Sequence, residues 1–246
     1  MKNAVLMQEN NRLRCNLFFI LTCLVLLCTL RSMKKAFDLS VYVVIDPSVC
    51  GGRAVCDVAV AAVRGGATMV QLRNKADSLD VIKDQALDIQ KALADSSVRF
   101  ILNDYVDLAA DIDADGVHIG QGDMLAAHAR AILGHEKIIG LTAFTRAHYD
   151  ALDPTIVDYV GTGPFYATLT KPDKAVLGAD GFSNLISHAP VPVVGIGGIT
   201  PENAGAVIAA GASGVAMMRG VTEAEDVESA VRAYVKIIEG ARREHS

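Results

Sequence analysis

Two cationic side chains and an amide alternate at the end of a short apolar segment, a pattern that can bind an anion. The segment Thr68–Leu72 runs into Gln71-Leu72-Arg73-Asn74-Lys75. Alternation along an extended chain places Gln71, Arg73 and Lys75 on one side, where two cations and an amide form an anion clamp. A solvated strand end is the alternative interpretation.

Two aspartates each follow a further apolar segment. Asp104 comes after Arg99–Asn103, and Asp123 comes shortly after Gly116–Ile119. Carboxylates at the mouths of adjacent strands can share a hard cation, so beside the clamp they predict a Mg²⁺ ion that bridges a diphosphate. Asp104 could instead cap the next helix. His118 lies inside its segment by its period and is interpreted as a packed or supporting residue rather than a catalyst.

A long connection, from residue 161 to about residue 178, carries further groups that bind phosphate. Thr168, Thr170 and Lys171 lie within it and can hydrogen-bond to phosphate oxygens or neutralise them. Connections of this length in compact domains usually serve function, so this one is predicted to be a lid. A plain surface loop is the alternative.

Glycines mark a second anion site near the end of the chain. Gly195-Ile196-Gly197-Gly198-Ile199 precedes Thr200-Pro201, which is typical of a helix start with threonine as N-cap. Met217-Met218-Arg219-Gly220 follows a later apolar run. Backbone N–H groups can approach an anion where side chains are absent, and a helix N-terminus adds its dipole. Two separate anion sites predict two phosphorylated substrates, or one ligand with a phosphate at both ends.

The elements that must position these residues alternate from residue 38 onward. Short apolar runs separated by helical patterns predict parallel strands with right-handed crossovers. Eight such units predict a single closed (β/α)₈ barrel; an open doubly wound sheet is the alternative, but no Gly-x-Gly-x-x-Gly follows the first run. Strands are predicted at Val41–Asp46, Thr68–Leu72, Arg99–Asn103, Gly116–Ile119, Ile138–Thr142, Asp158–Gly161, Val193–Ile196 and Gly214–Met218, and helices at Arg53–Arg64, Leu79–Ala94, Tyr105–Asp111, Met124–Leu133, Arg146–Leu152, Gly181–Ser187, Pro201–Ala210 and Ala224–Glu239.

Composition narrows the class of protein. The 246 residues are 51% hydrophobic and 21% charged, which excludes a disordered chain and allows a large core. Aromatic residues make up only 5%, with no Trp, and the net charge is −5. These values argue against partners such as nucleic acid or an anionic membrane. The expected partners are small-molecule substrates, and the sequence leaves a homo-oligomer open.

The first residues form a basic, apolar leader. Residues 17–30 contain only two polar side chains, but as a helix they are too short for a ~30 Å hydrocarbon core. The leader is similar to a signal peptide, yet Arg31-Ser32-Met33-Lys34-Lys35 offers no small-x-small cleavage site. The two interpretations are a weak membrane or export segment and a translation start assigned too early. The second is favoured, so residues 1–33 are expected to be an N-terminal extension and residues 34–246 a cytoplasmic catalytic barrel without stable membrane association.

In combination, these motifs resemble those of the thiamine-phosphate synthase family, a family of TIM barrels. The resemblance spans about residues 40–240, with its motifs in family order. The matching segments are QLRNK (71–75), LNDY (102–105), HIGQGD (118–123), GTGPFYATLTKPD (161–173), GIGGI (195–199) and GASGVAMM (211–218).

The resemblance implies a transferase reaction. Hydroxymethylpyrimidine diphosphate would lose diphosphate, and the nitrogen of a thiazole phosphate would add to the pyrimidine-methyl cation to give thiamine phosphate. Arg73, Lys75 and Lys171 would be catalytic because they stabilise the departing diphosphate, while Asp104 and Asp123 would bind Mg²⁺. By the same resemblance, the pyrimidine diphosphate is held by Gln71, Arg73, Lys75, Asn103, Thr142 and Lys171, and the thiazole phosphate by Thr168, Thr170, Gly198, Met218 and Arg219, the last two through the main chain.

The chain also departs from the family pattern. Thr142 replaces the more usual serine, Phe144 stands where a histidine is common, Ala167 replaces a proline, and Arg219 stands where a serine is often found. Alternative functions are a thiazole tautomerase-like relative, another enzyme of the phosphate-binding barrels, or a non-catalytic binder of thiazole or thiamine phosphates. The complete clamp and both aspartates favour the synthase.

Overall fold

The computed structural model describes residues 36–170 and 174–244. The predicted extension, residues 1–33, and the predicted catalytic Lys171 therefore lie outside the described residues. Within the described ranges, no helix is long and apolar enough to cross a membrane.

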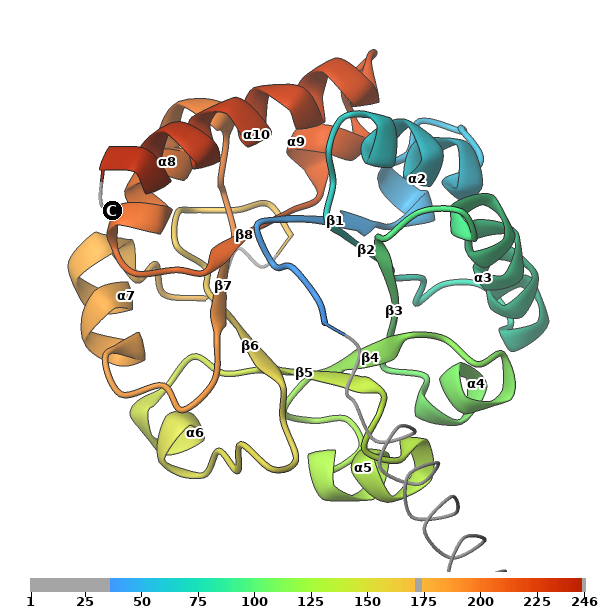
Figure 1. Ribbon diagram of the computed structural model, residues 1–246, viewed down its shortest axis with the longest axis horizontal. Helices are drawn as coiled ribbons and strands as arrows, with labels where there is room; N and C mark the ends of the chain where they lie inside the picture. Colours follow the sequence, from blue (N-terminus) through green and yellow to red (C-terminus); the bar gives the residue numbers. More distant parts are fainter. Residues whose placement is uncertain (1–35, 171–173, 245–246) are drawn as a thin grey trace, which may run out of the picture. The chain divides into compact units, whose positions relative to one another are not determined.

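Eight parallel strands close into a barrel, each paired with its neighbour in sequence and β8 paired with β1. Helices surround this ring (Figure 1). The predicted (β/α)₈ fold is thus confirmed. The strands are β1 (Val41–Ile45), β2 (Met69–Leu72), β3 (Arg99–Asn103), β4 (Gly116–Ile119), β5 (Ile138–Thr142), β6 (Tyr159–Thr162), β7 (Val193–Ile196) and β8 (Gly214–Met217). The helices are η1 (Pro47–Val49, a 3-10 turn), α2 (Val55–Arg64), α3 (Leu79–Leu93), α4 (Val106–Asp111), α5 (Ala126–Leu133), α6 (Arg146–Asp150), α7 (Gly178–Ile186), α8 (Pro201–Ala209), α9 (Arg219–Thr222) and α10 (Val227–Glu244).

The last helix begins and ends later than its predicted bounds, Ala224–Glu239, and a short helix that the sequence missed precedes it. Short α9 ends at Thr222, and α10 begins at Val227 and continues to Glu244. Asp226 explains the break, because its Oδ1 accepts the Ser229 N–H at 3.0 Å and its Oδ2 accepts the Ser229 hydroxyl at 2.6 Å. This is the hydrogen-bond pattern of a helix N-cap, so a new helix starts there.

The sequence missed η1 after β1. Asp46 begins this turn: its Oδ1 accepts the Ser48 N–H at 3.0 Å and the Ser48 hydroxyl at 2.6 Å. Pro47 occupies the first position of the turn, where a missing N–H costs nothing. Asp46 thus lies beyond the strand end, among the loops that follow the strands.

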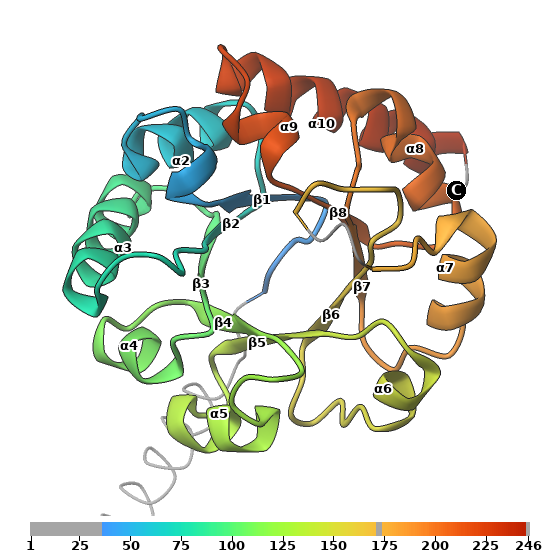
Figure 2. The same cartoon turned by 180° about the vertical axis from the view of Figure 1, so that it is seen from behind.

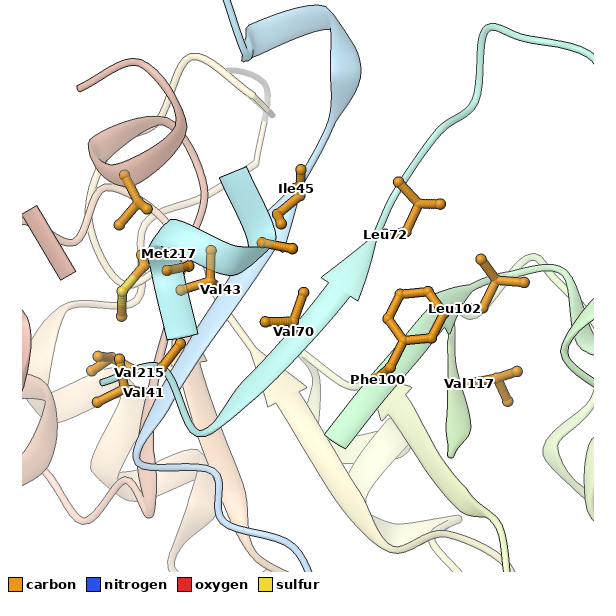
Figure 3. Packing of buried hydrophobic residues seen from close by; sticks show 14 of the residues in the cluster. Val41, Val43, Ile45, Val70, Leu72, Phe100, Leu102, Val117, Val215 and Met217 are labelled. Atoms are coloured by element: carbon orange, nitrogen blue, oxygen red, sulfur yellow. The ribbon is translucent and has the colours of Figure 1, made fainter. Parts of the chain in front are cut away.

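The hydrophobic core has two layers because side chains alternate along each strand. One set points outward and packs against the helices; it includes Val43, Val70 and Leu102 (Figure 3). The other set fills the barrel interior and includes Tyr42 and Tyr159. Branched apolar side chains cover the outer face of the barrel and pack against the helices. The inner face can therefore carry polar side chains near its C-terminal end.

Candidate active site

A cavity of about 420 Å³ lies at the C-terminal ends of the strands, the end of a barrel where catalytic residues gather. This volume falls within the usual range for small-molecule sites. The loop after β6 lies beside β7 and β8 at this end of the barrel (Figure 2). The predicted site residues that line the cavity are Gln71, Arg73, Asn103, Thr142, Thr168, Thr170, Gly198, Met218 and Arg219.

Three predicted residues form a separate cluster beside Asn103. The Lys75 Nζ lies 2.6 Å from the Asp104 Oδ2, and the Asp123 carboxylate is close enough to raise the pKa of Asp104. Burial is the largest cause of that raised pKa, and Lys75 opposes it. On its other side, the Asp123 Oδ2 accepts the Gly120 N–H at 2.8 Å. The cluster therefore brings two carboxylates together next to the cationic clamp.

The pair of carboxylates fits a magnesium ion. Among the described residues, no three His, Cys, Asp or Glu side chains converge as a complete ligand set. Mg²⁺ usually takes one or two carboxylates from the protein and completes its octahedron with water and substrate phosphates. Asp104 and Asp123 match that requirement, provided that a phosphate-bearing ligand supplies further oxygens.

Arg73 has a partner that the sequence did not reveal. Its guanidinium forms an ion pair with the Asp46 carboxylate, whose side chain is only 10% exposed. With Lys75 on Asp104, both cations of the clamp are thus neutralised by carboxylates at neighbouring strand ends. The sequence made Asp46 the last residue of the predicted strand Val41–Asp46, and this place at a strand end was the available signal.

Asn103 presents an unused donor at the cavity. The residue is 7% exposed and lines the cavity, and its buried Nδ2 has no hydrogen-bond partner among the described residues. Buried polar atoms are nearly always paired in folded proteins, so an unpaired one at a cavity wall indicates a ligand acceptor. The Nδ2 group is therefore the strongest single indication that this cavity takes a polar ligand.

Close backbone contacts build the opposite end of the cavity. The loop after β6 lies on the β7 turn, with the Phe165 N–H donating to the Ile196 carbonyl at 2.9 Å and the Tyr166 N–H to that of Gly197 at 3.0 Å. Gly198 has φ +63°, and a Cβ there would lie 2.3 Å from the Ala167 carbonyl oxygen. Glycine is thus required, both by conformation and by space.

Comparisons with known proteins identify the family of this chain. A sequence model of the thiamine monophosphate synthase family matches residues 41–221. A thiamine-phosphate synthase of Xanthobacter autotrophicus is 43% identical over 211 residues, covering 85% of this chain and all of the relative. A second, from Azorhizobium caulinodans, is 42% identical over 212 residues, covering 86% of this chain and all of the relative.

The chain belongs to the thiamine-phosphate synthase family. Its structure is similar to a solved thiamine phosphate pyrophosphorylase from Pyrococcus furiosus, with a TM-score of 0.76 and 30% identity over 82% of this chain and 96% of the other. An orotidine 5'-phosphate decarboxylase from Pyrococcus horikoshii has a TM-score of 0.58 at 12% identity over 80% of this chain and 99% of the other, which reflects the barrel fold alone.

Two positions where the chain departs from the thiamine-phosphate synthase pattern bring cations to the cavity. The Arg219 guanidinium pairs with Glu223 one helical turn later, and its buried Nε has no hydrogen-bond partner among the described residues. Lys174, which sequence reasoning missed, also lines the cavity, and its Nζ lies 3.3 Å from the centre of the Phe144 ring. Aromatic faces attract ammonium groups, so Phe144 holds the Lys174 ammonium at the cavity. Phe144 is the position at which the resemblance leads us to expect a histidine.

Proposed function

We propose that this chain condenses hydroxymethylpyrimidine diphosphate with thiazole phosphate, releasing diphosphate and thiamine phosphate. The bond from the pyrimidine methylene carbon to the diphosphate oxygen breaks, and the same carbon bonds to the thiazole nitrogen. The unpaired Asn103 Nδ2 carries the proposal, because it is a buried donor of a residue that lines the cavity and it has no partner among the described residues. The same family name among close relatives supports it.

The cationic clamp would stabilise the leaving group. Arg73 and Lys75 pair with Asp46 and Asp104 respectively, and a diphosphate offers each of them a more highly charged partner. Lys75 would release Asp104 as it moves to the diphosphate. Cations next to the oxygen that gains charge lower the barrier to bond breaking, since they stabilise the charge that develops in the transition state.

The proposed metal ion fits the same step. Mg²⁺ bound by Asp104 and Asp123 would neutralise charge on the diphosphate. The chain's own contribution is to hold both carboxylates: the Gly120 N–H fixes Asp123, and the Asp104 N–H donates to the His118 carbonyl at 2.9 Å. Lys171 would add a further cation from the loop after β6.

The glycine-rich end would hold the thiazole phosphate. Thr168 and Thr170 line the cavity there, and the Thr170 N–H already donates to the Thr168 hydroxyl at 3.3 Å. The main chain at Gly198, Met218 and Arg219 would supply donors. The two phosphorylated groups would thus occupy opposite ends of one cavity, with the reacting atoms between them. We also propose that the enzyme acts in the cytoplasm, where phosphorylated metabolites are available.

One assay tests this function against its alternatives. The full chain is given both substrates, with and without Mg²⁺, and the formation of thiamine phosphate and of diphosphate is followed. We expect both products in equal amounts and only with Mg²⁺. A thiazole tautomerase-like relative or a simple binder would release no diphosphate, and that result would overturn the proposal.

A further inference from the structure

A chain of hydrogen bonds crosses the floor of the cavity and joins side chains from strands on opposite sides of the barrel. The Gln71 Nε2 donates to the Tyr42 Oη at 2.6 Å, and the Tyr42 Oη lies 2.8 Å from the Tyr159 Oη. The Tyr159 Oη lies 3.1 Å from the His118 Nδ1, and the His118 Nε2 lies 3.0 Å from the Thr142 Oγ1. Both ends of this chain line the cavity.

The Gln71 donor favours one direction along the chain of hydrogen bonds. The Tyr42 oxygen accepts from Gln71, which favours the order in which its single proton points to Tyr159. In that order Tyr159 donates to the His118 Nδ1, which accepts without a proton of its own. In the same order the His118 Nε2 carries a proton and donates it to the Thr142 hydroxyl. The Thr142 hydroxyl proton is left for the cavity.

Two strand glycines make room for the chain, which shows that it is built into the fold. A Cβ at Gly140 on β5 would lie 2.1 Å from the Tyr159 Cζ. A Cβ at Gly161 on β6 would lie 3.0 Å from the His118 Cε1. Both tyrosine rings are fully buried, and burial raises the pKa of each hydroxyl, so each hydroxyl stays protonated and able to donate.

We propose that Tyr159 is a positioning residue that fixes the donor pattern offered to the pyrimidine; this inference rests on the proposed function. Through Tyr42 it sets which side of the Gln71 amide faces inward, leaving Oε1 and one N–H for a ligand. Through His118 it makes Thr142 a donor. An aminopyrimidine has a complementary edge, because its amino group donates and its ring nitrogens accept. Tyr159 touches no reacting atom and acts only through its neighbours.

The test compares Tyr159→Phe with a matched control. Phenylalanine keeps the ring and removes the hydroxyl that joins the two halves of the chain. Tyr149→Phe is the control: Tyr149 is also buried, its hydroxyl lies 2.6 Å from the Thr162 Oγ1, and it does not line the cavity. Both variants lose one buried tyrosine hydroxyl, so their melting temperatures should fall by similar amounts.

The kinetics should separate the two variants. We expect Tyr159→Phe to lower kcat/KM for the pyrimidine diphosphate by roughly tenfold, the scale of one or two lost hydrogen bonds, with KM for thiazole phosphate unchanged. Tyr149→Phe should keep both parameters. Equal kinetics in the two variants would overturn the positioning role.

A spectroscopic measurement tests the direction of the chain without turnover. In ¹⁵N-histidine-labelled protein, His118 is assigned by comparison with His118→Gln. We expect the proton on Nε2 and an accepting Nδ1 in the wild type, and a changed tautomer balance in Tyr159→Phe. A wild-type His118 protonated on Nδ1 would refute the inference. A wild type that shows the expected tautomer but makes no thiamine phosphate would refute the proposed function instead.

Discussion

Asp104 allows the metal assignment and the local backbone geometry to be tested separately. Its φ is 65°, in the left-handed region, and its N–H donates to the His118 carbonyl at 2.9 Å. That bond ties the turn to β4, so a substituted residue cannot relax to another conformation cheaply. A left-handed conformation costs an ordinary residue about 1–2 kcal/mol, and aspartate, asparagine and glycine tolerate it better.

The variants Asp104→Ala, Asp104→Gly and Asp104→Asn divide the two effects. Glycine removes the strain of about 1–2 kcal/mol but adds about 0.5–1 kcal/mol of backbone entropy cost, so we expect its free energy of unfolding to exceed that of alanine by roughly 0.5–1 kcal/mol. All three lose the ion pair with Lys75, a side chain that is 50% exposed, so this loss contributes little and equally. The melting temperatures should differ by about 1–4 °C in a chain of this size.

Turnover should not follow that order. Each variant lacks the carboxylate proposed to bind Mg²⁺, so all three should lose most Mg²⁺-dependent product formation, whatever their stability. Urea unfolding measures the free energy of unfolding of each variant. Diphosphate release against Mg²⁺ concentration measures its Mg²⁺-dependent turnover. An alanine variant as stable as the glycine variant would refute the backbone reasoning, and wild-type activation by Mg²⁺ in any variant would refute the metal assignment.

Three further changes probe the two ends of the cavity and the leader. Gly198→Ala should raise KM for thiazole phosphate at least on the order of tenfold, because the new Cβ would meet the Ala167 carbonyl oxygen. The control is Gly205→Ala in α8, where the nearest atom to the new Cβ is 3.7 Å away, so this variant should bind thiazole phosphate normally. Equal affinities of the two variants would contradict this reasoning. Lys171→Ala should slow single-turnover bond cleavage by about 10²–10³ while Thr168→Ala weakens thiazole-phosphate binding, and exchanged effects would mean that the two anion sites are reversed. A chain that starts at Met33 should be soluble and fully active in the same assay, and loss of folding would show that the leader is needed.

Local sequence patterns were sufficient to predict the barrel. Eight apolar runs alternate with helical patterns, and all eight appear as strands within one or two residues of their expected bounds. Such runs are informative because a parallel strand buried on both faces needs branched apolar side chains throughout. The helix start at Pro201 was equally local, since a capping threonine and a proline act on their own backbone.

The alternation along β2 was applied to Gln71, Arg73 and Lys75; the first two line the cavity, whereas Lys75 pairs with Asp104 and does not line it. Gln71, Asn103 and Thr142 share the inward face of β2, β3 and β5 and line one cavity, as the period of two requires. Closure of the barrel then brings strand ends together in a known order, so the fold class alone was enough to group residues far apart in the chain.

Contacts between distant segments could not be read from the sequence. Tyr42 and Tyr159 are 117 residues apart, and only the closed barrel with Gly140 beside them lets their hydroxyls meet. The pairing of Arg73 with Asp46 and the left-handed backbone of Asp104 likewise depend on neighbouring strands. Residue types and periods, which are local properties, determined the fold and the chemistry available at its open end. The partner of each charge and of each buried hydroxyl depends on three-dimensional neighbours, and only the tertiary structure decided them.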